Sequence, residues 1–211
     1  MRTALYAALL LLIAVPAGAA APAASPASAP ASVPGPASAP APPSSAEMDA
    51  WLKAAAPNEN HAVLAKMAGS FKVESRFFAG PDAEPHVSYG TAEQAMVFGG
   101  RYLRQDFTGD MGGQPFQGTG FIGYDNLRKR YFSYWLDSGS TMPLQHEGTC
   151  DNKACTSITL RGEYTDPLTG KKKKSRTITE TTDDARVIFT MFDEDKKGKE
   201  FRSLELIYTR R

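Results

Sequence analysis

Two cysteines separated by four residues give the clearest chemical signal in the sequence. Cys150 and Cys155 flank residues 151–154, which have the composition of a hairpin turn. Directly opposed residues of paired antiparallel strands bring their Cβ atoms within about 4.5–5.5 Å, and a disulfide needs about 3.8 Å. We therefore predict a Cys150–Cys155 disulfide in an oxidising compartment. The alternatives are two free thiols or a redox pair, although the spacing differs from the Cys-x-x-Cys of a thioredoxin-like site.

An aromatic segment at residues 130–137 carries a second candidate site. Tyr131, Trp135 and Asp137 share one face if the segment is a strand, because a strand repeats its direction every second residue. Burial of that face in a solid core would desolvate the carboxylate, which is costly unless a cation or donors pair with it. We therefore predict a ligand pocket with Trp135 in its wall and Asp137 and Arg101 at its polar end. The alternative is an ordinary core of aromatics with a strand-end aspartate and a buried ion pair.

Two further carboxylates on other predicted strands complete the candidate ligand-binding set. The full set is Arg101, Tyr131, Trp135, Asp137, Glu147 and Glu205. Such a set suits a small molecule with an apolar body and a polar end. It also allows a second interpretation, an enzyme that uses pocket carboxylates for acid–base work on a small substrate.

Motifs for other chemistry are missing from the sequence. None of His61, His86 and His146 has a second histidine or a carboxylate at metal-ligand spacing. There is no Gly-x-Ser-x-Gly elbow, phosphate-binding glycine loop or dinucleotide fingerprint. We therefore expect no metal and no cofactor, and we assign no catalytic residue.

The elements that must position these residues are mostly strands. An amphipathic pattern predicts a helix over residues 59–68, which ends at Gly69. After it the apolar period changes to two, and turn residues separate about ten short segments. The predicted strands cover residues 71–77, 87–98, 101–108, 116–124, 130–137, 142–150, 154–164, 175–181, 186–192 and 200–209.

Short loops between these strands indicate an antiparallel meander. A meander of ten strands exposes two edges unless it closes, so we predict an all-β, antiparallel up-and-down β-barrel with one short N-terminal helix. A barrel of this size encloses either packed side chains or one small ligand. The alternative architecture is a β-sandwich.

The first 46 residues differ in composition from the rest of the chain. They contain one charged residue, Arg2, and nine of the fifteen prolines. Residues 1–19 have the pattern of a secretory signal peptide, because Arg2 is followed by an apolar run at 7–15 and small residues at 17–19. That run is too short to span a bilayer. We predict a periplasmic or secreted protein with a disordered Ala/Pro/Ser-rich linker at 20–57 and one domain at 58–211.

Several segments of that domain resemble one bacterial family. They are LAKMAGSF (64–71), FGGRYL (98–103), GTGFIGYDN (118–126), YFSYWLDS (131–138), EGT (147–149), GEYTDPLTGK (162–171) and KEFRSLELIYTR (199–210). Together they are similar to the family called Domain of Unknown Function 1579, over residues 58–211. The resemblance implies a lipocalin-like or fatty-acid-binding-like barrel and supplies no catalytic residues. Phe71, where tryptophan is usual, and the cysteine pair depart from the family pattern.

Charge and composition limit the partners that we expect. Outside the first 46 residues, Lys and Arg balance Asp and Glu, so no excess of basic charge supports binding to nucleic acid. We expect no transmembrane segment and a monomer. The predicted function is non-covalent binding of a small hydrophobic or amphipathic molecule. The alternatives are the enzyme described above and an envelope or stress accessory protein without a ligand.

Overall fold

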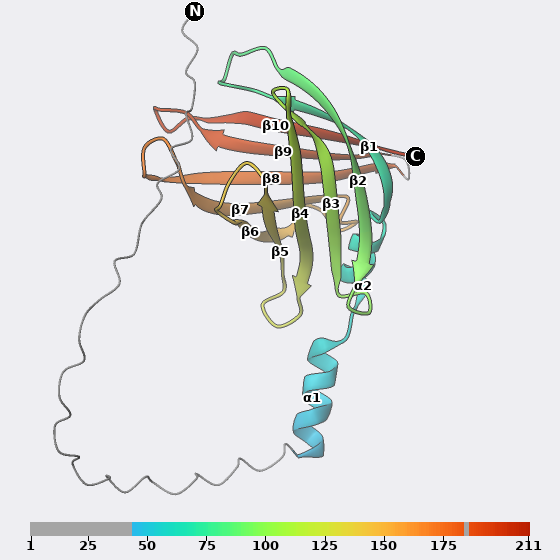
Figure 1. Cartoon of the computed structure of the whole chain (residues 1–211). Coiled ribbons are helices and arrows are strands. Elements are labelled where there is room, and N and C mark those ends of the chain that lie inside the picture. The colour runs from blue at the N-terminus through green and yellow to red at the C-terminus, as the bar shows by residue number, and fades with distance from the viewer. Residues whose placement is uncertain (1–43, 184–185) are drawn as a thin grey trace, which may run out of the picture. The chain divides into compact units, whose positions relative to one another are not determined.

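A computed structural model describes residues 44–183 and 186–211 as two short helices followed by a ten-stranded antiparallel β-barrel (Figure 1). The helices are α1 (Ser45–Ala55) and α2 (Glu59–Ala65). The strands are β1 (Gly69–Phe77), β2 (His86–Val97), β3 (Tyr102–Met111), β4 (Gln114–Asp125), β5 (Arg130–Asp137), β6 (Leu144–Cys150), β7 (Ser157–Thr165), β8 (Lys172–Asp183), β9 (Arg186–Glu194) and β10 (Glu200–Arg210).

The sheet is closed, as the meander pattern predicts. Each strand pairs with its neighbours in sequence, and β1 pairs with β10 so that Phe71 lies opposite Arg210. Closure leaves no unpaired sheet edge, which is the reason for preferring a barrel to a sandwich. The predicted ten-stranded barrel is therefore confirmed, and the predicted strand limits agree with the observed ones to within a few residues.

The apolar core lies at the end of the barrel that α2 covers. Leu64 and Met67 are buried against Phe71 and Leu103, and Phe71 is fully buried beneath the ring of Tyr208 in an edge-to-face contact of 5.8 Å. The buried apolar side chains are Leu64, Met67, Phe71, Val73, Ala92, Leu103, Phe107, Tyr131, Ile158, Leu160, Val187 and Tyr208. In β1 the buried Phe71 and Val73 alternate with the polar residues Lys72 and Glu74, which is the pattern of a sheet with one buried face.

Helix α2 begins where the sequence predicts. The side chain of Asn58 accepts a hydrogen bond from the backbone N–H of Asn60, and His61 Nδ1 accepts one from the backbone N–H of Asn58. The helix ends at Ala65, three residues earlier than predicted. Its last turn tightens there, because Met67 N–H donates to the Leu64 carbonyl, three residues back.

Helix α1 corrects part of the predicted linker. Residues 45–55 lie inside the segment 20–57 that composition assigned to disorder, yet they form a helix that no prediction contained. Ser44 and Glu47 make a capping box, in which each side chain accepts from the other residue's backbone N–H. The capping box favours a helix at these residues, although the sequence that precedes them is rich in proline. None of the helix residues is buried, so packing contributes little to its stability.

The Cys150–Cys155 disulfide is present, with the two Cα atoms 5.1 Å apart. The intervening turn is held by a hydrogen bond from Asp151 N–H to the Ser157 carbonyl and by one from Cys155 N–H to the Asn152 carbonyl. The bridge joins the end of β6 to the loop that leads into β7. The predicted pairing is therefore confirmed.

The predicted signal peptide and residues 20–43 of the predicted linker lie outside the described residues. Neither α1 nor α2 is long and apolar enough to cross a membrane.

Candidate functional site

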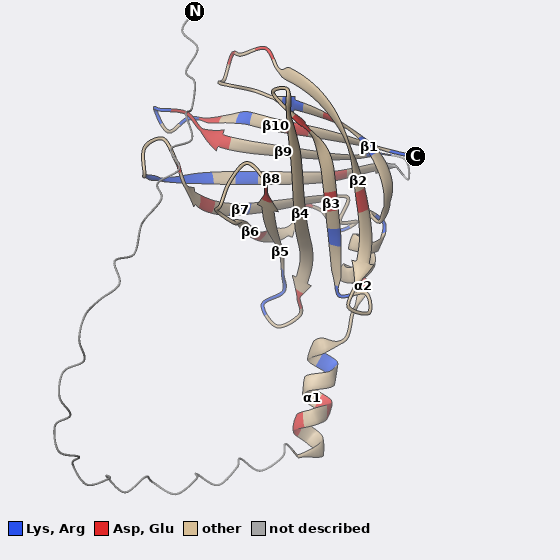
Figure 2. Ribbon diagram, viewed as in Figure 1, with Lys and Arg blue, Asp and Glu red and all other residues tan. Residues whose placement is uncertain are grey.

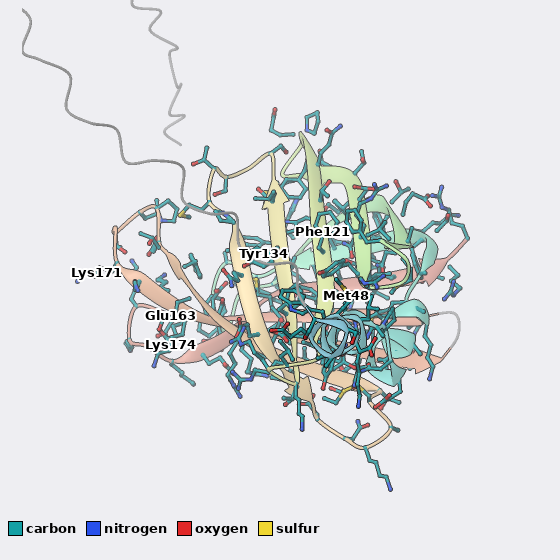
Figure 3. All side chains as sticks on the ribbon, turned by 90° about the horizontal axis from the view of Figure 1, so that it is seen from below. Met48, Phe121, Tyr134, Glu163, Lys171 and Lys174 are labelled. Atoms are coloured by element: carbon teal, nitrogen blue, oxygen red, sulfur yellow. A yellow bond between two sulfur atoms is a disulfide. The ribbon has the colours of Figure 1, made fainter. Side chains whose placement is uncertain are left out.

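Strand β5 carries three of the six residues that the sequence predicts to bind a ligand, on its inward-facing side. Tyr131, Trp135 and Asp137 alternate with side chains on the outer surface such as Tyr134 (Figure 3). Tyr131 is buried, and Trp135 packs against the apolar core. The face of β5 that was predicted to form the pocket wall therefore lies on the inside of the barrel.

Trp135 lies flat against the neighbouring strand β4. A Cβ added to Gly118 would meet the indole Cζ2 at 2.1 Å, and one added to Gly120 would meet Cε3 at 2.7 Å. The two glycines therefore make room for the ring. This role of the two glycines is not among the predictions from the sequence, although a Gly-x-Gly pair on the strand next to a tryptophan is a usable signal.

Asp137 is satisfied by donors close to it in the chain. The indole Nε1–H of Trp135 donates to Asp137 Oδ2 at 2.8 Å, and the backbone N–H of Gly139 donates to Oδ1 at 2.9 Å. These bonds offset the desolvation of the carboxylate without a cation. They also fix the plane of the indole along the inner wall.

The predicted pairing of Asp137 with Arg101 is wrong. Arg101 lies in the turn between β2 and β3, where its guanidinium donates to the carbonyls of Ala55 and Phe98 at 2.9 and 3.0 Å. The next residue, Tyr102, pairs with Gly123, whereas Asp137 pairs with Gly118 at the other half of β4. The two side chains therefore belong to opposite ends of the barrel.

Glu147 and Glu205 are also placed differently from the prediction, because both lie on the outer surface. Glu147 accepts from both terminal nitrogens of Arg128, at 2.7 and 2.5 Å, and these bonds lower the pKa of its carboxyl. Glu205 accepts from Arg76 at 2.8 Å and from Arg202 at 2.7 Å. The register decides this placement, since Glu147 pairs with the outward Phe132. The structure therefore does not assemble the two convergent carboxylates of the enzyme interpretation.

Tyr131 lies at the closed end of the barrel, next to α2. Its ring contacts Tyr124 edge to face at 4.8 Å, and its hydroxyl donates to the Asn60 carbonyl at 3.3 Å. Burial raises the pKa of Tyr131 to about 12. The residue therefore joins the helix to the wall as a neutral phenol.

The inner wall also holds polar groups that the sequence did not nominate. Gln94 Nε2 donates to Gln105 Oε1 at 3.1 Å, and Gln105 Nε2 donates to the Tyr208 hydroxyl at 3.0 Å. Burial raises the pKa of Tyr208 to about 12. The three residues come from β2, β3 and β10, so no local pattern links them.

A second polar group lies across the barrel wall from β6 to β9. His146 Nε2 is 2.7 Å from Ser175 Oγ, and both side chains are buried. The histidine reaches across Gly162, where an added Cβ would lie 2.9 Å from His146 Cδ2. Desolvation lowers the pKa of His146, and the nearby Asp193 carboxylate opposes that shift.

Asp193 is the least satisfied polar side chain of this group. It lies opposite Ser175 in the pairing of β8 with β9. Burial raises the pKa of Tyr164 to about 12, and the nearby Asp193 carboxylate adds to this rise. Its Oδ1 atom is buried and has no hydrogen-bond partner within the described part of the chain. A hydrogen bond from a further donor to this atom would offset the cost of its burial.

The arrangement lacks the geometry of nucleophilic catalysis. Ser175 and His146 form a hydrogen-bonded pair, but both are about 5% exposed, and no hydrogen bond joins Asp193 to His146 within residues 44–183 and 186–211. A triad needs an accessible nucleophile and an acid that orients the histidine. The described part of the chain contains no group of three or more His, Cys, Asp or Glu side chains that could hold a metal ion.

Two of the grooves of the described domain lie on its outer surface. The larger, about 610 Å³, crosses β5 to β7 and is lined by Arg130, Gln145, Glu147, Gly148, Thr149, Asp151, Thr159, Arg161 and Glu163. The smaller, about 340 Å³, lies over β7 to β10 and includes Phe192 beneath the guanidinium of Arg176, 3.9 Å from the ring centroid. The first has no apolar wall, so an amphipathic molecule would bury little apolar area there.

Residues 56–210 match the model of a family described as "Protein of unknown function (DUF1579)". The chain belongs to this family. The match includes α2 and nearly all of the barrel, and it leaves α1 outside. The resemblance drawn from the sequence is therefore confirmed for this DUF1579 member.

Among solved structures, the DUF1579 chain is similar to a redesigned β-barrel. The two are 14% identical, the similarity covers 71% of this chain and 95% of the other, and the TM-score is 0.35. No curated protein matches the chain. The barrel itself is established by the strand pairing described above.

Proposed function

We propose that this protein is exported and binds a small amphipathic molecule inside the barrel. The observation that carries the proposal is partial exposure of apolar side chains on the inner wall. Ile122, Trp135, Phe189 and Leu206 all face inward and are only half-buried. A closed barrel with a fully packed interior would bury them.

The wall is divided in a way that suits such a molecule. Apolar side chains gather at the end covered by α2, while Phe77 and Met111 continue the inward-facing series at the other end and are 54% and 58% exposed. We call this second end the open end. Polar groups lie between the two, including His146 and Asp193. An apolar body would contact the wall while a polar end meets these groups.

The charges of the inner wall favour a neutral or cationic polar end. Asp137 and Asp193 carry carboxylates there, and Lys173 is already paired with Asp166 at 3.1 Å. Desolvation lowers the pKa of His146, so that residue adds little positive charge at neutral pH. A carboxylate ligand would meet like charge in a medium of low dielectric constant.

Trp135 provides the test. In a Trp51→Phe background it is the remaining tryptophan, and titration with decylamine, decanol and decanoate should change its emission most for the first two. The matched variant Trp135→Phe retains Trp51, which is 74% exposed, and should show no comparable change. If none of the three ligands alters Trp135 emission and native mass spectrometry of the purified protein finds no bound molecule, the proposal is wrong. A preference for decanoate would refute the charge argument alone.

A further inference from the structure

Lysines gather on two adjacent turns at the open end. The turn between β7 and β8 leads into Lys171, Lys172 and Lys174, and the turn between β9 and β10 carries Lys196, Lys197 and Lys199, all of them exposed. The turns are neighbours because β8 pairs with β9 through Ser175 and Asp193. Figure 2 shows the basic colour at both turns, and in Figure 3 Lys171 projects away from the barrel. We call these six residues the lysine rim.

Carboxylates also lie close to the rim, and several of them are bonded to its turns. Asp166 is paired with Lys173, and Asp195 accepts backbone N–H bonds from Lys197 and Lys199. Glu200 is held by Arg176, with Nε 2.9 Å from Oε2. Glu163 lies 3.7 Å from Lys172 in a largely exposed pair, which contributes little. Residues 165–174 carry four lysines and one carboxylate, whereas residues 194–200 carry three of each sign, so the excess of positive charge comes from the turn between β7 and β8.

An apolar residue projects from the same place. Leu168, at the tip of the turn between β7 and β8, is 93% exposed. The turn is braced from within, because Asp166 accepts bonds from Leu168 N–H at 2.9 Å and from Thr169 Oγ1 at 3.0 Å. Gly170 N–H also donates to the Asp166 carbonyl at 2.8 Å. The leucine is therefore held in water by a well-bonded turn.

We propose that the open end docks on an anionic lipid bilayer, with Leu168 entering the interface and the lysine rim contacting the headgroups. An apolar tip surrounded by cations gains from both parts of such a surface, the acyl boundary and the negative headgroups. A nucleic acid or an acidic protein would use the lysines alone and would leave the leucine exposed. The docking does not require a ligand inside the barrel.

The opposite end of the barrel offers a matched control. Leu127, in the turn between β4 and β5, is 79% exposed and is followed by basic residues. Arg128 is paired with Glu147, and Arg130 lies 3.9 Å from the same carboxylate. With Lys129, this turn has three cations against the carboxylates of Asp125 and Glu147, so Leu127 has less net positive charge around it than Leu168 and should bind a bilayer more weakly.

Sedimentation with vesicles tests the affinity. The full chain should bind vesicles of phosphatidylcholine mixed with phosphatidylglycerol, but not phosphatidylcholine alone, and high salt should release it. The triple variant Lys171→Gln, Lys172→Gln, Lys174→Gln should lose on the order of tenfold or more in affinity. Leu168→Ala should weaken binding several-fold, and Leu127→Ala should not. Absence of wild-type binding, or equal binding to both vesicles, would overturn the proposal.

Tryptophan placed at the tip tests insertion separately. With Trp51→Phe and Trp135→Phe in place, Leu168→Trp should show emission at shorter wavelength when anionic vesicles are added. Leu127→Trp in the same background should show no shift. Leu168, Leu127 and Trp51 are exposed, whereas Trp135 packs against the core, so a circular dichroism spectrum checks that each variant keeps the fold. If Leu168→Ala binds as well as wild type, and single-stranded DNA binds with the same dependence on the lysines, the partner is a polyanion and not a lipid surface.

Discussion

Two groups of buried polar side chains in this barrel are satisfied by hydrogen bonds across strands. Gln105 links Gln94 to Tyr208, and His146 is bonded to Ser175. Such pairing offsets the cost of removing polar groups from water. Asp193 Oδ1 has no hydrogen-bond partner among the described residues, and it lies where the proposed ligand would present its polar end.

Burial of His146 leads to a prediction about pH. Because desolvation lowers its pKa in the folded state, the unfolded chain binds more protons below the ordinary histidine value. The contribution to stability is complete above that value and is lost as the pH falls. We expect urea unfolding to give a lower free energy at about pH 5.5 than at about pH 7.5. His146→Gln should reduce this difference, although His61, whose pKa is also lowered by burial, will retain part of it.

His86→Gln is the matched control for that experiment. His86 is exposed at the start of β2, and its replacement should leave the pH dependence as in wild type. An unchanged dependence in His146→Gln would show that the buried pair does not contribute to it.

At the scale of elements, small residues on one strand make room for large side chains on the next. β4 carries Gly118 and Gly120 because the Trp135 ring of β5 lies against its backbone. α2 contributes Leu64 and Met67 to the core at the end that it covers. The disulfide ties β6 to the loop before β7, and a closed loop of this length should contribute on the order of 2 kcal/mol.

Gly118 allows this view of β4 to be tested. Gly118→Ala should displace the indole and lower the free energy of unfolding by about 1–3 kcal/mol, because the new Cβ overlaps the ring. In the Trp51→Phe background the emission of Trp135 should change as well. Gly80→Ala, where no atom lies within 4 Å of the added Cβ, should have little effect on either measurement. Equal effects of the two substitutions would contradict the steric role.

At the scale of the whole molecule, the described domain is a barrel with a covered end and an open end. The proposals use these ends differently, since the interior holds the ligand and the lysine rim meets the bilayer. Both would act outside the cytoplasm if the first 19 residues are removed on export, and the disulfide is compatible with that compartment.

Export is tested by the mass of the mature chain. We expect protein isolated from the periplasm or the medium to begin near Ala20, because the apolar run at 7–15 is followed by small residues that suit cleavage. Intact mass spectrometry measures this directly. A retained Met1 or an attached lipid would contradict the prediction.

The sequence determined the elements, because their signals are local. Alternation of apolar residues set the strands, glycine pairs set turns such as Gly112-Gly113, and the short spacing of Cys150 and Cys155 set the disulfide. Helix α1 also had a local signal, the capping box of Ser44 and Glu47, which the surrounding composition concealed. Interactions between residues close in sequence are nearly the same in any fold that keeps the element.

Only the tertiary structure decided which residues meet. Parity related Tyr131, Trp135 and Asp137 to one another, but both faces of β5 are aromatic, so parity alone did not say which face is inside. Strand register then placed Glu147 and Glu205 outside and Arg101 at the far end. Gln105 and Tyr208 meet although 103 residues separate them. Such contacts depend on barrel closure, which is a property of all ten strands together and of no single segment.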